Sequence, residues 1–279
     1  MIARLAVAPA VLLTLATGAP AAPSPLVGAG AFLAAAQQRD GGFAEAGRTS
    51  DPSLTSWAAL GLVASGGSSD ARARTLVYLR AHEDFSTSRT GVALQALARV
   101  ALGDHPESLL ARLRTVESGS LVNANVWTIL ALRSAGETAP PPLVAALRAA
   151  QSDSGGWSWT RGGKPDSNDT AAALEALRAA GIAGTSIARG LAALRSFRNP
   201  DGGYALTPGR DPDAQSTAWA IQALIACGKR PGAATWRFLW KLRRTDGSYR
   251  YSARYGATPV WVTAQVAVAL AGRPYPLAP

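Results

Sequence analysis

The sequence is poor in the residues that bind metals and form disulfide bonds. Its 279 residues include one cysteine and two histidines. A single cysteine excludes an internal disulfide framework and any cysteine-rich zinc module. Two histidines are too few for a histidine-based metal centre and argue against a histidine-dependent catalytic triad. We therefore expect neither a bound metal nor a cofactor.

Charged residues are also scarce, and their balance is basic. They make up 16% of the chain, with 28 Lys and Arg against 18 Asp and Glu and a formal net charge of +10 at pH 7. The arginines are spread over many segments, among them Arg72, Arg148 and Arg237. This spread predicts a solvated outer face and no nucleic-acid partner. Contact with an anionic cell envelope is the alternative that the positive surplus leaves open.

Long apolar runs are absent apart from one at the N-terminus. Arg4 precedes the apolar segment Leu5–Thr17, which is too short to span a bilayer. The small residues Ala19 and Ala21 fit a signal-peptide cleavage site. We therefore expect a signal peptide over residues 1–21, a secreted or cell-envelope location, and no transmembrane anchor after cleavage. An apolar first helix of the fold is the alternative interpretation.

Glycine is abundant, and much of it recurs in one turn motif. In four clear copies a glycine is followed two positions later by an aromatic residue, and these glycines are Gly41, Gly155, Gly202 and Gly247. A polar residue that opens an Ala- and Leu-rich helix recurs at intervals of 35 to 47 residues, always with a leucine seven positions later. These openers are Thr55, Thr90, Asn125, Thr170, Thr217 and Thr263. Repetition of this period is typical of stacked helical hairpins.

Each repeat predicts a helix, a glycine-rich turn, a loop and a second helix, with no convincing strand. The first helices of the six hairpins are expected over residues 26–37, 69–81, 107–116, 143–151, 185–198 and 233–243. Six hairpins form either an open solenoid or a closed ring, and we favour closure. The sequence thus predicts an all-α fold, an α6/α6 toroid with inner and outer rings of helices. This single domain is expected over residues 26–279, after a short linker at 22–25.

Helical periodicity predicts which residues of the inner helices face the axis of the ring. At 100° per residue, the second and fifth positions after each opener point away from the face that packs on the outer helices. The candidates at these positions are Trp57, Gln95, Trp127, Glu175, Trp219, Gln222 and Gln265. Candidates just before the openers, at the expected mouth, are Asp51, Asn123, Asp166, Asn168, Asp213, Gln215 and Trp261. Such a wet, partly apolar cavity predicts a small-molecule or glycan ligand.

Two segments resemble motifs of one protein family. Gln151–Trp157 fits the Gln-x-x-x-Gly-x-Trp repeat (QW motif) of squalene–hopene and oxidosqualene cyclases, and Gln37–Phe43 fits it with phenylalanine in place of tryptophan. Asp166–Ala171 is similar to the Asp-x-Asp-Asp-Thr-Ala motif of class II terpene cyclases. The chain therefore resembles the prenyltransferase/squalene-oxidase repeat superfamily over residues 26–272. The resemblance implies an α/α toroid in which the glutamine and the aromatic residue tie each turn to a helix.

The resemblance also implies where catalysis would occur. In the cyclases the middle aspartate of the motif protonates the polyene, whereas this chain has Asn168 there, between Asp166 and Asp169. An amide cannot donate that proton, although either flanking aspartate could replace it if burial raised its pKa. Family cyclases use two toroid domains, and this chain is long enough for one.

Two functions follow from these residues. The first is a secreted, non-catalytic toroid that binds a small molecule or glycan in its axial cavity or at its acidic rim. The alternative is an active terpene-cyclase-like or glycan-processing enzyme that uses Asp166, Asp169 or Glu175. Helix capping is a simpler interpretation of Asp51, Asp166 and Asp213, because aspartates satisfy free N–H groups at helix N-termini.

Overall fold

The computed structural model describes residues 24–277, except 116–118 and 120. The expected signal peptide, residues 1–21, lies outside the described residues. Within the described part the chain forms no strand, and five isolated β-bridges join turn segments. The α-helices are α1 (Pro25–Ala36), α2 (Pro52–Ala64), α3 (Ser69–Ala81), α4 (Arg89–Ala101), α5 (Glu107–Arg114), α6 (Val122–Ser134), α7 (Pro141–Ala149), α8 (Ser167–Ala179), α9 (Thr185–Ser196), α10 (Ala214–Ala226), α11 (Ala233–Lys241) and α12 (Pro259–Leu270). None of these helices is both long enough and apolar enough to cross a membrane.

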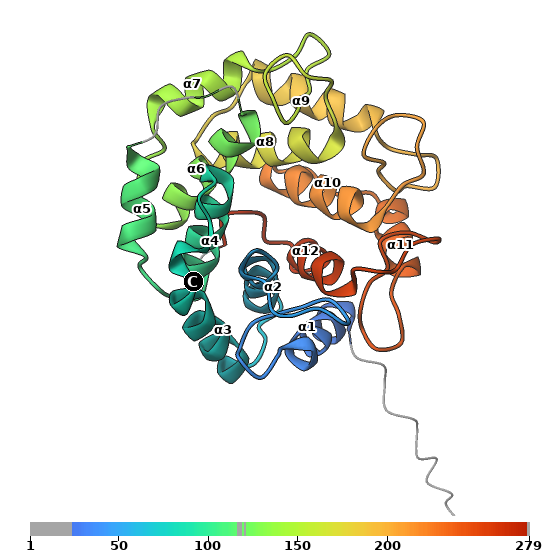
Figure 1. Cartoon of the computed structure of the whole chain (residues 1–279). Coiled ribbons are helices and arrows are strands. Elements are labelled where there is room, and N and C mark those ends of the chain that lie inside the picture. Colours follow the sequence, from blue (N-terminus) through green and yellow to red (C-terminus); the bar gives the residue numbers. More distant parts are fainter. Residues whose placement is uncertain (1–23, 116–118, 120, 278–279) are drawn as a thin grey trace, which may run out of the picture.

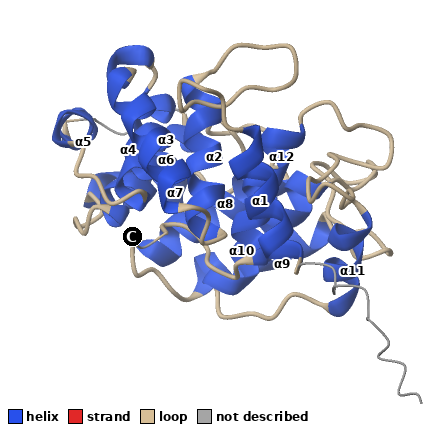
Figure 2. Ribbon diagram, turned by 90° about the horizontal axis from the view of Figure 1, so that it is seen from below, coloured by secondary structure: helices blue, strands red, loops and turns tan. Residues whose placement is uncertain are grey.

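The helices form two concentric rings (Figure 1). The even-numbered helices make the inner ring, and each contacts the next one around the axis. Because α12 contacts α2, the ring is closed and is not an open solenoid. The odd-numbered helices pack outside against the inner helices, and Figure 2 shows the same all-helical assembly after a quarter turn. The structure thus confirms the predicted all-α toroid of inner and outer helices.

The ring closes at a close approach between α2 and α12. A Cβ atom at Gly61 would lie 2.8 Å from the Cα atom of Ala264, so this position has room only for glycine. The equivalent positions of other inner helices hold buried alanines, among them Ala223 and Ala269. These small residues let adjacent inner helices pack at short distance.

The inner helices begin earlier than the sequence pattern predicted. α2 begins at Pro52, three residues before the expected opener Thr55, and the other inner helices also begin before their openers. The expected start was wrong because Asp51 is the N-cap, with its carboxylate accepting a hydrogen bond from the Leu54 N–H at 2.7 Å. α1 likewise begins at Pro25, inside the expected linker, because proline suits the first position of a helix.

The threonine openers tie the turns to the inner helices. The hydroxyl oxygen of Thr170 accepts a hydrogen bond from the backbone N–H of Trp157 at 3.0 Å. Three other pairs make the same contact: Thr55 with Phe43, Thr217 with Tyr204, and Thr263 with Tyr249. All these residues are buried. Each contact therefore satisfies an N–H group that water cannot reach.

Replacing Thr170 with valine should lower the free energy of unfolding by ~1–3 kcal/mol, because the buried N–H of Trp157 would lose its acceptor. The two side chains have nearly the same shape, so packing changes little. Urea unfolding followed by circular dichroism measures the loss. Thr185→Val, at an exposed position, is the matched control and should change stability by ~0.5 kcal/mol or less. Equal losses in the two variants would contradict this role of Thr170.

Each glycine turn also joins one repeat to the outer helix of the next. Gly155 has a φ of 88°, and a Cβ atom there would lie 2.6 Å from the carbonyl oxygen of Arg189 on α9. The Gln151 side-chain amide donates to the carbonyl oxygens of Gly155 at 2.8 Å and Ser186 at 2.9 Å. One glutamine side chain therefore hydrogen-bonds both to the turn and to the next outer helix, and it holds the two together.

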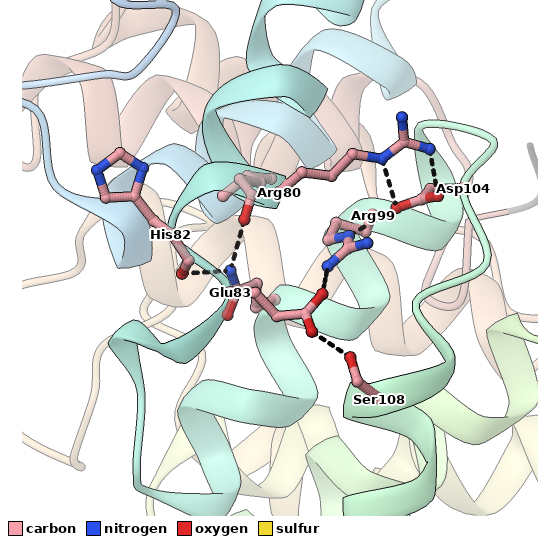
Figure 3. A network of polar contacts seen from close by, with 8 residues as sticks. Arg80, His82, Glu83, Arg99, Asp104 and Ser108 are labelled. Atoms are coloured by element: carbon pink, nitrogen blue, oxygen red, sulfur yellow. Dashed lines mark hydrogen bonds and ion pairs between the residues drawn. The ribbon is translucent and has the colours of Figure 1, made fainter.

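The second repeat has an ionic network where four of the six repeats have a glycine turn (Figure 3). The 3₁₀ helix η1 (Glu83–Phe85) follows α3, and the Glu83 carboxylate forms an ion pair with Arg99 of α4. The buried Arg99 also donates to Asp104 at 2.6 Å. Burial would raise the pKa of Asp104, but hydrogen bonds from Arg80 and Arg99 outweigh it and lower the pKa to about 2. The network holds η1 against α4.

Candidate functional site

The six inner helices enclose a cavity of about 630 Å³ at the end of the ring where these helices begin. Each inner helix contributes residues from its first two turns. A concave site of this volume is typical of small-molecule binding. The predicted site residues that line it are Trp57, Gln95, Asn123, Trp127, Asp166, Asn168, Asp169, Gln215, Trp219, Trp261 and Gln265.

Three tryptophans from alternate inner helices form the deep end of this cavity. The ring centroids of Trp57, Trp127 and Trp219 lie 5.2 to 6.1 Å apart, and their planes are nearly perpendicular. This edge-to-face arrangement is favoured by the aromatic quadrupole. The Gln265 side-chain oxygen accepts a hydrogen bond from Trp219 Nε1 at 2.7 Å, which fixes the orientation of that ring. Tyr275, from the segment after α12, packs on Trp127 and Trp219 and does not line the cavity.

The two aspartates of the motif lie side by side on the cavity wall at the start of α8. Asp166 is the N-cap, and its carboxylate accepts the Asp169 N–H at 2.8 Å. The Asp169 carboxylate accepts a hydrogen bond from the Asn123 side chain at 3.1 Å and is 8% exposed. Burial, followed by the neighbouring Asp166 carboxylate, raises the pKa of Asp169 to about 7. Near neutral pH, Asp169 therefore exchanges a proton, while Asn168 beside it does not titrate.

The raised pKa keeps Asp169 largely protonated below pH 7, which is the condition under which a flanking aspartate could donate a proton. Asn168, between the two aspartates in the sequence, has no proton to donate. The site can donate and accept hydrogen bonds and pair with a charged group. Among the described residues, no cluster of three or more His, Cys, Asp or Glu side chains could hold a metal ion.

Four predicted site residues do not line the cavity. Asp51 and Asp213 turn their carboxylates toward their own helices, where each accepts a backbone N–H at 2.7 Å as the N-cap. Gln222 and Glu175 are completely buried. The Glu175 carboxylate accepts the Tyr275 N–H at 2.8 Å. Both lie one turn beyond the tryptophan level along their helices, and neither reaches the cavity wall, although Gln95 at the same level of α4 does.

Three apolar residues at the mouth were missed by the sequence reasoning, which named polar residues and Trp261 as the candidates before the openers. Phe85, Leu121 and Trp159 line the cavity and are 44 to 53% exposed. They precede three different inner helices in the sequence, in η1 and in two loops. A large apolar residue in an otherwise polar loop was the one available signal. Their exposure gives the mouth an apolar rim.

No protein-family model matches the chain, and no curated protein matches it significantly. Solved structures do match. A variant of the type II terpene cyclase MstE from Scytonema, in complex with geranylgeranyl dihydroxybenzoate as substrate, is 17% identical with a TM-score of 0.63, covering 88% of this chain and 95% of that one. Another MstE variant, in complex with merosterolic acid A as product, is 17% identical with a TM-score of 0.64, covering 89% of this chain and 95% of that one.

A protein from Actinoplanes is similar at 16% identity, with a TM-score of 0.60 over 89% of this chain and 98% of that one. The chain therefore has the toroid fold of the type II terpene cyclase MstE. At this level of identity the likeness shows the fold alone.

Proposed function

We propose that this protein is a secreted, non-catalytic toroid that binds a small, largely apolar molecule in its axial cavity. One observation carries the proposal: the cavity has an aromatic deep end and a polar wall, and Asn168 lies on that wall. The resemblance to the cyclase motif implies that this is the place of the proton donor. The tryptophans supply apolar contact area, and the amides and Asp169 supply hydrogen bonds that would orient a ligand. The same fold in MstE holds a substrate and a product, which supports a small-molecule ligand.

A thermal-shift screen on the chain from Ala22 onward tests binding. A compound at 100 times its Kd should stabilise the fold by about 2.7 kcal/mol, which corresponds to ~5–10 °C in Tm. The library should include prenylated aromatics and oligosaccharides, since tryptophan also stacks on sugar rings. Ala172→Leu, which places a larger side chain into the cavity, should abolish the shift. Ala188→Leu, at an exposed position on α9, is the matched control and should leave it unchanged.

The same preparation tests the absence of catalysis. Squalene and geranylgeranyl dihydroxybenzoate are incubated with the protein, and products are separated by gas or liquid chromatography. We expect both compounds to be recovered unchanged. Formation of cyclic products by the protein, and its loss in Asp169→Asn, would show that the site is an active cyclase and would overturn the proposal.

A further inference from the structure

We infer that the axial cavity selects an organic cation, an apolar molecule with a positively charged nitrogen group held against the tryptophan rings beside Asp166 and Asp169. This inference rests on the proposed function, because it names the ligand class of the same site.

The aromatic lining is the first observation. Five of the eight tryptophans of the chain line this one cavity. They are Trp57, Trp127, Trp159, Trp219 and Trp261. The face of an indole ring carries negative potential, and tryptophan is the strongest aromatic partner for a cation. A neutral hydrocarbon would be served equally well by leucine or phenylalanine, whereas a cation gains from indole in particular.

The charges of the lining are the second observation. The chain carries 28 Lys and Arg against 18 Asp and Glu, yet the described residues that line the cavity include two aspartates and no Lys, Arg or His. An anionic ligand group would meet the Asp166 and Asp169 carboxylates with no cation on the wall to offset the repulsion. A positive group finds attraction from both, strengthened because these groups are partly shielded from water.

Binding of a cation should be linked to the proton on Asp169. The groups around this carboxyl are Asp166 on its own helix, neutral Asn123 on α6, and neutral Thr90 and Gln215 on α4 and α10 across the cavity. Burial and Asp166 raise the pKa of Asp169 to about 7, and a bound cation lowers it again. The cation therefore displaces the proton, and its affinity should rise about tenfold between pH 6 and pH 8. A neutral ligand has no such linkage.

Choline and 3,3-dimethyl-1-butanol test the inference, because they have nearly the same shape and differ in the charge of the quaternary atom. Affinities for the chain from Ala22 onward are measured by calorimetry and by tryptophan fluorescence at pH 6 and pH 8. At pH 8 we expect choline to bind about tenfold more tightly than 3,3-dimethyl-1-butanol. The affinity for choline should also fall about tenfold from pH 8 to pH 6, whereas that for the alcohol should not change. Asp169→Asn should remove that dependence, whereas Asp211→Asn, at an exposed site outside the cavity, should retain it.

Equal affinity for the two compounds, or tighter binding of the alcohol, would overturn the inference and leave the proposed function standing. A flat pH profile for choline would also overturn it. Failure of both compounds to bind overturns the inference as well, and the wider thermal-shift screen then decides separately whether the cavity binds a ligand of another class.

Discussion

Replacement of Trp157 by alanine should lower the free energy of unfolding by ~3–5 kcal/mol, a large part of the total stability of a typical domain. The side chain is completely buried, and its Nε1 donates to the Leu147 carbonyl oxygen of α7 at 2.7 Å. Its backbone N–H binds Thr170 of α8, and its ring lies against Gly190 of α9. One residue therefore joins three helices, and its removal leaves a cavity and an unpaired acceptor.

Far-UV circular dichroism during urea unfolding measures this effect without depending on tryptophan fluorescence. Trp157→Phe keeps a ring and loses the indole N–H, so it should fall between wild type and Trp157→Ala. The first repeat supports this expectation, because Phe43 occupies the same place in its turn and is completely buried. Trp240→Ala, at a site 49% exposed on α11, is the control and should cost less than ~1 kcal/mol. Similar losses at Trp157 and Trp240 would contradict the role of the turn residue.

Replacement of Glu175 by glutamine should remove the part of the pH dependence of stability above pH 5 that comes from this carboxyl. Burial raises the pKa of Glu175 well above its usual value of 4.5, although the Tyr275 N–H opposes this. The folded protein therefore keeps the proton that the unfolded chain releases. The contribution to stability is fully present below pH 4.5. It is lost as the pH rises toward the folded pKa, by about 1.4 kcal/mol for each pH unit.

The measurement compares Glu175→Gln with wild type in urea at pH 5, 6, 7 and 8. Glutamine cannot ionise, so the stability of the variant relative to wild type should increase steadily with pH. Glu107→Gln is the control of opposite sign, because a hydrogen bond from Arg114 lowers the pKa of that exposed carboxyl. The difference in the free energy of unfolding between Glu107→Gln and wild type should be constant above pH 5. A constant difference for Glu175→Gln as well would show that Glu175 is not held neutral in the folded protein.

The sequence predicted the arrangement of the helices better than it predicted which side chains line the cavity. Helical periodicity placed Trp57, Trp127 and Trp219 on the axis, because all inner helices share one orientation and one set of outer partners. The same periodicity wrongly placed Glu175 and Gln222 in the cavity. Periodicity predicts the direction in which a side chain points from its helix, but not its depth along the axis of the ring. The tryptophan cluster fills the axis between these two residues and the mouth.

The aspartates show a second limit. Asp51, Asp166 and Asp213 occupy equivalent sequence positions, and all three cap helices. Only Asp166 also lines the cavity. Capping depends on the local backbone, which repeats, whereas exposure to the cavity depends on loops from other repeats, which differ.

The sequence by itself determined the helical repeats and the aromatic, amide-bearing axis, because these depend on spacings that recur along the chain. It favoured a closed ring over an open solenoid, and the contact between α12 and α2 decided between the two. The absence of an aspartate at position 168 is also a property of the sequence alone. Tertiary structure decided the rest: the pairing of Asp169 with Asn123, the burial that raises its pKa, the segment after α12 that seals Glu175, and the apolar rim. Each of these joins residues far apart in the sequence, and their contact exists only after the ring has closed.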